Sequence, residues 1–364
     1  MIDRLASHPD PYPAYARLRR RGVHRLPDGR WVVARASEVA AVLAHPAAAV
    51  GPAAGRRTAP PAVARGSAPH PTGDGNGEAA AVRAAMARFS DGPDHDRRRA
   101  ISRRHIDAME PDRLRRHAAE LARDRLGDAR EVDVMATVAR SVPVAVLAGA
   151  LGIADRDSAV AATRQLCLAL APPVGAAPVA DTTAVATLRR LLEPVVGGHA
   201  DDELVNSLAI LFQAMDATAG LIGNAVVAAD RHPIAGLDPL DLVAETARHD
   251  PPVQQTTRLA VADVPIAGHT IPAGDRIVVL LAAANRDEVR FPRADAFDPD
   301  RRTSAFTFGA GPRPCPGDAH ALALAAGALD ALTATPARVV DRTIGYERRA
   351  NLRIPDRLIV RRFG

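Results

Sequence analysis

The sequence contains no lysine, because all 47 of its Lys+Arg residues are arginines. This absence excludes a lysine Schiff base, a pyridoxal-anchoring lysine and a phosphate-loop lysine. The 42 acidic residues leave a formal net charge of only +5 over 364 residues. A net charge this small argues against a nucleic-acid-binding arm or an acidic tail, so no nucleic acid is expected among the partners.

Cysteine and aromatic residues are also scarce. Only Cys167 and Cys315 occur, which excludes a disulfide framework, and no Cys-x-x-Cys pair is present to hold zinc or an iron-sulfur cluster. Aromatic residues make up 3% of the chain and hydrophobic residues 47%, so the core is expected to be helical and rich in Ala, Val and Leu. For Cys167, in RQLCLALA, we expect the role of a small buried apolar residue.

The sequence lacks the marks of export or membrane insertion. Its start, MIDRLASHPDPYP, carries acids and prolines where a signal peptide has a basic start and an apolar run. No stretch of about 18 uninterrupted apolar residues follows. We therefore expect a cytoplasmic protein that does not bind membranes.

Helical patterns dominate what is present. Helices are expected at residues 12–21 and 37–43, and almost continuously over residues 93–231. Breaks in this long run are expected near residues 110–111, 152–157, 172–174 and 197–198. Strands are expected at residues 30–35 and within 259–281 and 344–362. Residues 51–77 predict a long loop. No linker or repeat divides the chain, so we expect one mainly α domain over residues 1–364.

The segment FGAGPRPCPG, at residues 308–317, carries the strongest chemical signal. Turn-forming residues flank Cys315, and a helix rich in small residues is expected at residues 318–333. The three glycines let the backbone approach a flat ligand, while Arg313 and the helix N-terminus favour an anionic thiolate. The complete pattern F-x-x-G-x-R-x-C-x-G is far more specific than a lone cysteine, so Cys315 is expected to ligate a metal ion.

This segment resembles the haem-thiolate signature of the cytochrome P-450 superfamily. ETAR at residues 245–248 resembles the Glu-x-x-Arg motif of the family, and Arg301, in FDPDR, resembles its later partner arginine. The segments DPYPAYARLRRRGV, HDPPVQQTTRLA and AANRDEVRFPRADAFDPDRR extend the resemblance over nearly the whole chain. The resemblance implies a mainly α, single-domain cytochrome P-450 fold with small peripheral β-sheets, in which Glu245, Arg248 and Arg301 are structural.

The resemblance also implies a cofactor, haem b (iron protoporphyrin IX), with its iron ligated by Cys315. Basic residues of the family hold the haem propionates, and here His95 and Arg99 are four residues apart and share a helix face. The implied cofactor-binding residues are His95, Arg99, Arg258, Phe308, Gly309, Arg313, Cys315 and Gly317.

The implied reaction is a monooxygenation of a small organic substrate, a secondary metabolite, with dioxygen and two electrons from ferredoxin and ferredoxin reductase. The implied substrate contacts are the loop at residues 51–77 and Phe212, Gln213, Met215, Val253 and Gln254. Four arginines are either solvated surface charges or a patch that docks an acidic ferredoxin: Arg97, Arg98, Arg103 and Arg104.

The sequence departs from the family at the helix that activates oxygen, where Asp216, Ala217 and Thr218 are the implied catalytic residues. Asp216 stands at the position of the family's acid, but Ala217 replaces the usual alcohol and the hydroxyl moves on to Thr218. One residue turns a helical side chain by about 100 degrees, so Thr218 replaces the alcohol only with a bulge or a water. Alternatively, Asp216 and Thr218 are ordinary polar residues of a buried helix. Gln213 adds a bulky amide where the family has Gly or Ala.

The chain is also short for the family. Residues 192–203 leave little room for the usual helix before the long central one, and residues 229–242 compress the helix that follows it. This trimming and Ala217 keep two alternatives open. One is oxidative coupling or peroxide-driven haem chemistry, and the other is a catalytically silent haem-binding member of the family.

Overall fold

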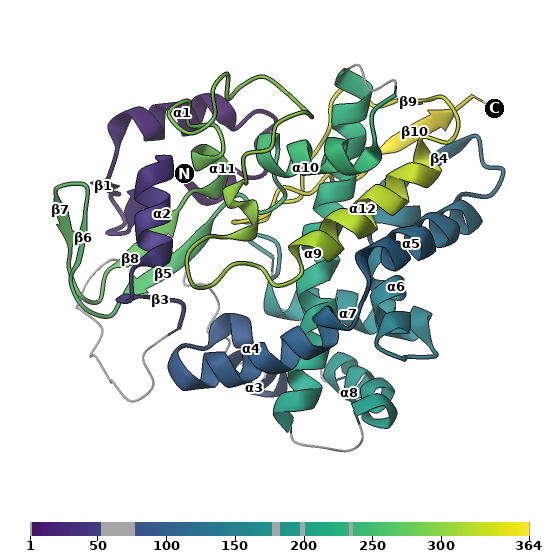
Figure 1. Cartoon of the computed structure of the whole chain (residues 1–364), viewed down its shortest axis with the longest axis horizontal. Coiled ribbons are helices and arrows are strands. Elements are labelled where there is room, and N and C mark those ends of the chain that lie inside the picture. The colour runs from purple at the N-terminus through teal and green to yellow at the C-terminus, as the bar shows by residue number, and fades with distance from the viewer. Residues whose placement is uncertain (1, 52–76, 177–182, 197–200, 233–235, 364) are drawn as a thin grey trace.

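The computed structural model describes residues 2–51, 77–176, 183–196, 201–232 and 236–363. These residues form a mainly helical structure with small sheets at its periphery, as the sequence predicts (Figure 1). The helices are α1 (Tyr12–Arg21), α2 (Ala36–Ala44), α3 (Gly77–Ala85), α4 (Gly92–Asp107), α5 (Pro111–Leu126), α6 (Val142–Ala150), α7 (Arg156–Leu170), α8 (Thr183–Val196), α9 (Asp201–Arg231), α10 (Pro239–His249), α11 (Leu281–Ala284) and α12 (Asp318–Leu332). Short turns of 3-10 helix are η1 (Ile2–Arg4), η2 (Ala87–Phe89) and η4 (Phe306–Phe308).

Helix α9 occupies the centre of the helical part (Figure 1). It is apolar on nearly every face, and α4, α6, α7, α8, α10 and α12 pack against it. By length and hydropathy it would also cross a membrane, but 67% of its most apolar stretch is buried inside the protein, as in a core helix. Its two buried asparagines join it to neighbouring segments: Asn206 accepts a hydrogen bond from the backbone N–H of Ala87, and Asn224 donates to the carbonyl of Asp250, both at 2.9 Å.

Ion pairs fasten α4 to the first turn of α9. Arg97 and Arg98 both contact Asp202, at 2.7 and 3.1 Å, and Arg104 contacts Glu203 at 2.6 Å. Arg103, the fourth arginine of the predicted patch, lies 3.7 Å from Asp107, which is one turn further along α4. All four predicted surface charges are therefore already paired within the protein.

The main sheet has the strand order β1-β2-β8-β5-β3, in which β2 and β8 are parallel and the other neighbours are antiparallel. Its strands are β1 (His24–Arg25), β2 (Trp31–Val33), β3 (Ala48–Ala49), β5 (Thr256–Ala260) and β8 (Arg276–Val279). The smaller sheets are the hairpin of β6 (Val264–Ile266) with β7 (His269–Ile271), and the set β4 (Glu131–Asp133), β10 (Ile359–Arg362) and β9 (Ala337–Val339). Figure 1 shows the main sheet beside α1 and α2, on the side of the molecule away from α5 and α12.

Two elements differ from the sequence predictions. The helix expected through residues 131–133 is instead β4, because Val132 pairs with Val360 of β10, a partner far away in sequence. A turn of π-helix at residues 135–139 follows. Within residues 344–362, only β10 is a regular strand, accompanied by isolated bridges. The loop expected at residues 51–77, apart from its two end residues, and the break expected at residues 197–198 lie outside the described residues.

Candidate active site

In the loop before α12, a hydrogen bond, two positive φ angles and close packing fix the backbone around Cys315. The N–H of Cys315 donates to the carbonyl of Phe308 at 2.7 Å. Gly309 and Gly311 have φ angles of +79° and +70°, a region that favours glycine. A Cβ on Gly311 would lie 3.0 Å from the carbonyl oxygen of Leu43, so the loop packs closely against the end of α2. Backbone conformation and packing therefore explain these two glycines without a ligand.

We call the surroundings of the Cys315 thiol, between its loop, α4 and β5, the recess. The side chain is exposed, yet burial is the main reason why the pKa of the thiol is raised above 9.0, and Asp318 adds to this effect. The N–H of Gly317 donates to the sulfur and favours the thiolate. The protein alone thus favours the neutral thiol, whereas a bound metal cation would favour the thiolate strongly.

Arg313, expected to favour the thiolate, is paired with a carboxylate beside the loop. The Arg313 guanidinium contacts Asp91 at 2.9 Å and donates to the carbonyl of Ser90 at 3.0 Å. The guanidinium groups that favour the Cys315 thiolate are instead those of Arg88 and Arg99. Arg88 is a residue that the sequence analysis missed, because a single arginine on a short turn belongs to no motif or periodic pattern.

A buried histidine lies beside this loop on α4. His95 is 6% exposed, its Nδ1 is 2.9 Å from the carbonyl oxygen of Ala87, and its buried Nε2 has no partner in the described part of the chain. Burial lowers the pKa of His95. Because Nδ1 faces a carbonyl, it carries the proton, so Nε2 becomes a donor only in the charged imidazolium. An anionic group at Nε2 would stabilise that form.

Arginines complete the basic surroundings of the recess. Arg99 of α4 donates to the carbonyl of Pro314 at 2.7 Å. Arg258 of β5 donates to Thr256 and Thr257 through Nη1 alone. Burial, together with the charges of Arg88 and Arg313, lowers the pKa of Arg258 to about 10. Of the predicted propionate-binding residues, His95, Arg99 and Arg258 therefore have no carboxylate partner in the described part of the chain.

Glu245 and Arg248 form a buried ion pair on α10. Nη2 and Nε of Arg248 donate to the two oxygens of Glu245 at 2.6 and 2.9 Å, and both residues are under 5% exposed. Arg301 lies 3.8 Å from Glu245. Arg248 also donates to three backbone carbonyls, those of Asn285, Ala294 and Ala296. The three predicted structural residues are together, and they tie α10 to the segment that leads to Cys315.

The middle of α9 presents its predicted catalytic residues on different faces. The helix is uninterrupted from Asp201 to Arg231, so no bulge brings Thr218 to the position of Ala217. Thr218 is 2% exposed, whereas Ala217 is half-buried. The side chain of Gln213 is folded back, with Nε2 donating to the carbonyl of Ala209 at 3.1 Å. Asp216 is 3.5 Å from Arg349 of the C-terminal segment.

Two predicted substrate contacts need correction. Gln254 is fully buried, and its Oε1 accepts a hydrogen bond from the hydroxyl of Tyr15 at 2.8 Å. Met215 is 2% exposed and packs in the main hydrophobic core. Sequence alone does not reveal which face of a long apolar helix is filled by neighbouring side chains. The other predicted contacts, Phe212, Gln213 and Val253, are partly exposed.

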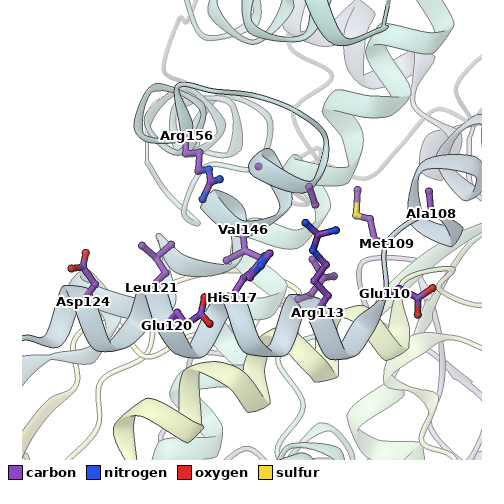
Figure 2. Close-up of a pocket in the computed structure, with 13 residues that line it drawn as sticks. Ala108, Met109, Glu110, Arg113, His117, Glu120, Leu121, Asp124, Val146 and Arg156 are labelled. Carbon is purple, nitrogen blue, oxygen red and sulfur yellow. The ribbon is translucent and has the colours of Figure 1, made fainter.

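A separate cavity of about 570 Å³ lies between α5, α6 and the start of α7. Figure 2 shows Arg113 and His117 of α5 and Arg156 of α7 directed toward one another across it. None of its lining residues belongs to α9 or to the Cys315 loop, so this cavity is not part of the site around the thiol.

The comparisons with known proteins agree with this arrangement. The family model for cytochrome P-450 matches residues 241–324. The chain is similar to the cytochrome P-450 monooxygenase PikC of Streptomyces venezuelae, with 30% identity over 348 residues that cover 85% of this chain and 79% of PikC. It is 29% identical over 327 residues to the 20-oxo-5-O-mycaminosyltylactone 23-monooxygenase of Streptomyces fradiae, covering 79% of this chain and 72% of that enzyme. The crystal structure of CalO2 superposes with a TM-score of 0.80 at 26% identity, over 97% of this chain and 96% of CalO2.

The fold and the thiol-bearing loop define a haem-thiolate oxidoreductase. The chain belongs to the cytochrome P-450 superfamily, and it is a monooxygenase of that type. The family implies a haem with cysteine-ligated iron, a small-molecule substrate and a redox partner.

The residues around Cys315 fit such a haem. A haem carries two carboxylates, and the recess offers the unpartnered Nε2 of His95 and the partly unused guanidinium of Arg258. The thiol of Cys315 needs a metal cation to become the thiolate. The donor set therefore matches both the iron and the acidic edge of the cofactor.

Proposed function

We propose that the protein holds haem b through Cys315 and hydroxylates a small secondary metabolite in the cytoplasm, with electrons from ferredoxin and ferredoxin reductase. The observation that carries the proposal is the exposed Cys315 thiol near His95, whose buried Nε2 has no partner in the described chain, and Arg258, which contacts no carboxylate there. The names of PikC and the Streptomyces fradiae enzyme support a monooxygenase, and the second name supports a secondary-metabolite substrate.

When bound, thiolate-ligated haem supplies the reductive activation of dioxygen. Cys315 provides the sulfur ligand, and the N–H of Gly317 hydrogen-bonds to it. His95, Arg99 and Arg258 bind the propionates, with His95 donating from Nε2 as the imidazolium. Asp216 is the residue of α9 that would pass a proton, because burial raises the pKa of its carboxyl.

Docking of ferredoxin is proposed for the face formed by α4 and the Cys315 loop. Arg97 and Arg104 are exposed but hold carboxylates at 2.7 and 2.6 Å, whereas Arg103 is exposed and holds Asp107 at only 3.7 Å. Arg103 is therefore the most available cation of the set. Arg103→Gln should lower the rate of reduction by ferredoxin and weaken its dependence on salt, whereas Arg123→Gln on α5 should change neither.

The test of the proposed function is incorporation of labelled dioxygen. The reconstituted protein, with ferredoxin, ferredoxin reductase and a panel of secondary metabolites, should place one labelled oxygen atom in a product. A protein that binds haem but forms no labelled product from any substrate, with either electrons or hydrogen peroxide, would instead be a silent member of the family.

The alanine at position 217 favours a second candidate function, peroxide-driven oxidation. The usual alcohol is missing at this position, and the uninterrupted helix keeps Thr218 on another face. Chemistry that starts from hydrogen peroxide demands less proton delivery from α9. Turnover with peroxide that exceeds turnover with ferredoxin, on the same substrate, would select this candidate.

A further inference from the structure

Arg88 is a cation without a counter-charge. It lies on the turn η2, and it makes no hydrogen bond or ion pair with the residues that the structure describes; its guanidinium carbon is 5.9 Å from the ring centroid of Phe89. Arg88 is exposed, yet burial lowers its pKa. The turn lies beside the Cys315 loop, because the carbonyls of the neighbouring Ala87 and Ser90 contact His95 and Arg313. From this turn the charge of Arg88 favours the Cys315 thiolate and lowers the pKa of Arg258.

The backbone around Arg88 is fixed on both sides. The N–H of Ala87 donates to Asn206 of α9 at 2.9 Å, and the carbonyl of Ala87 faces His95 at 2.9 Å. The carbonyl of Ser90 accepts from Arg313 at 3.0 Å. Arg88 therefore stands on a rigid turn between two predicted cofactor contacts, while its own side chain is free to meet a ligand.

The charges of the recess do not balance when haem is added. Four arginines surround it: Arg88, Arg99, Arg258 and Arg313. Asp91, paired with Arg313, is the one carboxylate bonded directly to any of them in the described chain. Haem b brings two propionates, so one guanidinium stays unmatched even if His95 is neutral. An unpaired cation beside a ligand site favours a ligand that supplies the missing negative charge.

Arg88 is the arginine left for that ligand. Arg99, Arg258 and Arg313 each have at least one hydrogen bond to the protein, which fixes them for a resident cofactor. Arg88 has none, as suits a partner that enters and leaves. We propose that Arg88 binds a carboxylate of the substrate, so that the enzyme selects acidic substrates. This inference rests on the proposed function, because the substrate must share the recess with haem.

The experiment uses probes that anchor on the haem iron and therefore need no knowledge of the substrate. These are ω-(imidazol-1-yl)alkanoic acids of increasing chain length, each compared with the matching alcohol, and titrated into the holoenzyme by the shift of the haem absorption band. One charge-assisted hydrogen bond in a desolvated site corresponds to a preference of about tenfold or more. At the chain length that reaches Arg88, the acid should therefore bind about tenfold more tightly than the alcohol.

Three variants separate the possible outcomes. Arg88→Gln should abolish the preference for the acid without loss of haem, and Arg88→Lys should keep part of the preference. The control is Arg83→Gln, which should leave the preference unchanged; the Arg83 guanidinium lies 4.3 Å from the ring centroid of Phe89.

Equal binding of acid and alcohol at every chain length, or a preference that survives Arg88→Gln, overturns the proposal. Faster transfer of haem from Arg88→Gln to apomyoglobin, with no preference for acids in the wild type, would show that Arg88 holds a propionate instead. A wild-type protein without a haem-thiolate spectrum would refute the proposed function itself.

Discussion

Oδ2 of Asp216 lies 3.5 Å from Nη2 of Arg349, and this contact joins the middle of α9 to the C-terminal segment. Arg349 is 5% exposed, and it also contacts Glu347 at 2.9 Å and the carbonyl of Ala171. Glu347 in turn contacts Arg140 at 2.5 Å. Asp216 is thus at one end of a series of ion pairs that continues through Arg349 and Glu347 to Arg140. Its own contact in this series is the 3.5 Å contact with Arg349.

The protonation of Asp216 should make stability depend on pH. Burial raises the pKa of this carboxyl above 3.8, and the charge of Arg349 opposes the shift only in part. Because the folded state then binds the proton more tightly than the unfolded chain, the contribution of Asp216 to the free energy of unfolding falls as the pH rises from about 4 through the folded pKa. The stability of Asp216→Asn relative to the wild type should therefore increase over this range. Urea unfolding at several pH values measures it, and a difference that does not change with pH would contradict it.

The buried pair on α10 should be essential for stability. Glu245→Gln leaves Arg248 as an uncompensated buried charge, and the expected loss in the free energy of unfolding is about 3–5 kcal/mol. Asp241→Asn is the matched control on the same helix, because Asp241 pairs with the exposed Arg302; its loss should be about 1 kcal/mol or less. Urea unfolding of both variants decides the point. Equal losses would mean that burial of Glu245 adds nothing.

The alanine at position 217 should make oxygen use inefficient. Without a hydroxyl there, proton delivery is poor, and part of the reducing power should end as free hydrogen peroxide. Ala217→Thr should lower the peroxide released per electron consumed, whereas Thr218→Val should not change it, since the Thr218 side chain is buried away from that position. Equal peroxide release in the wild type and Ala217→Thr would show that the missing hydroxyl has no part in coupling.

Pro316 should set the electron density on the ligand sulfur. The N–H of Gly317 donates to the sulfur, but Pro316 has no N–H to add. Pro316→Leu restores a second donor, withdraws electron density and should raise the midpoint potential of the haem. Pro312→Leu in the same loop is the control. A potential unmoved by Pro316→Leu, with only a small change in stability, would leave Pro316 as a residue that shapes the start of α12.

Much of the architecture follows from local sequence. The helices α1 and α2 and the strands β5 to β8 lie where periodicity and spacing predict them, and Glu245 and Arg248 share a helix as the family resemblance implies. The strand β4 was beyond such reasoning, because its extended form depends on pairing with β10 more than 200 residues later. Long-range pairing overrides local helical preference.

The site was less predictable than the fold for a related reason. Residue type and spacing point to Cys315, and the family resemblance adds His95, but neither reveals that Arg313 is paired with Asp91 or that Gln254 is bonded to Tyr15. Arg88 carries no motif at all, and only its place on a turn beside His95 reveals its surroundings. Such facts depend on which side chains the fold brings together.

The most direct test of the account is the spectrum of the reduced protein with carbon monoxide. The wild type and Cys167→Ala should show the red-shifted band of a thiolate-ligated haem, because Cys167 is 3% exposed and packs in the core. Cys315→Ala should lose that band. A Cys315→Ala protein that keeps the thiolate band, or a wild type that never shows it, would contradict the assignment of Cys315 as the haem ligand.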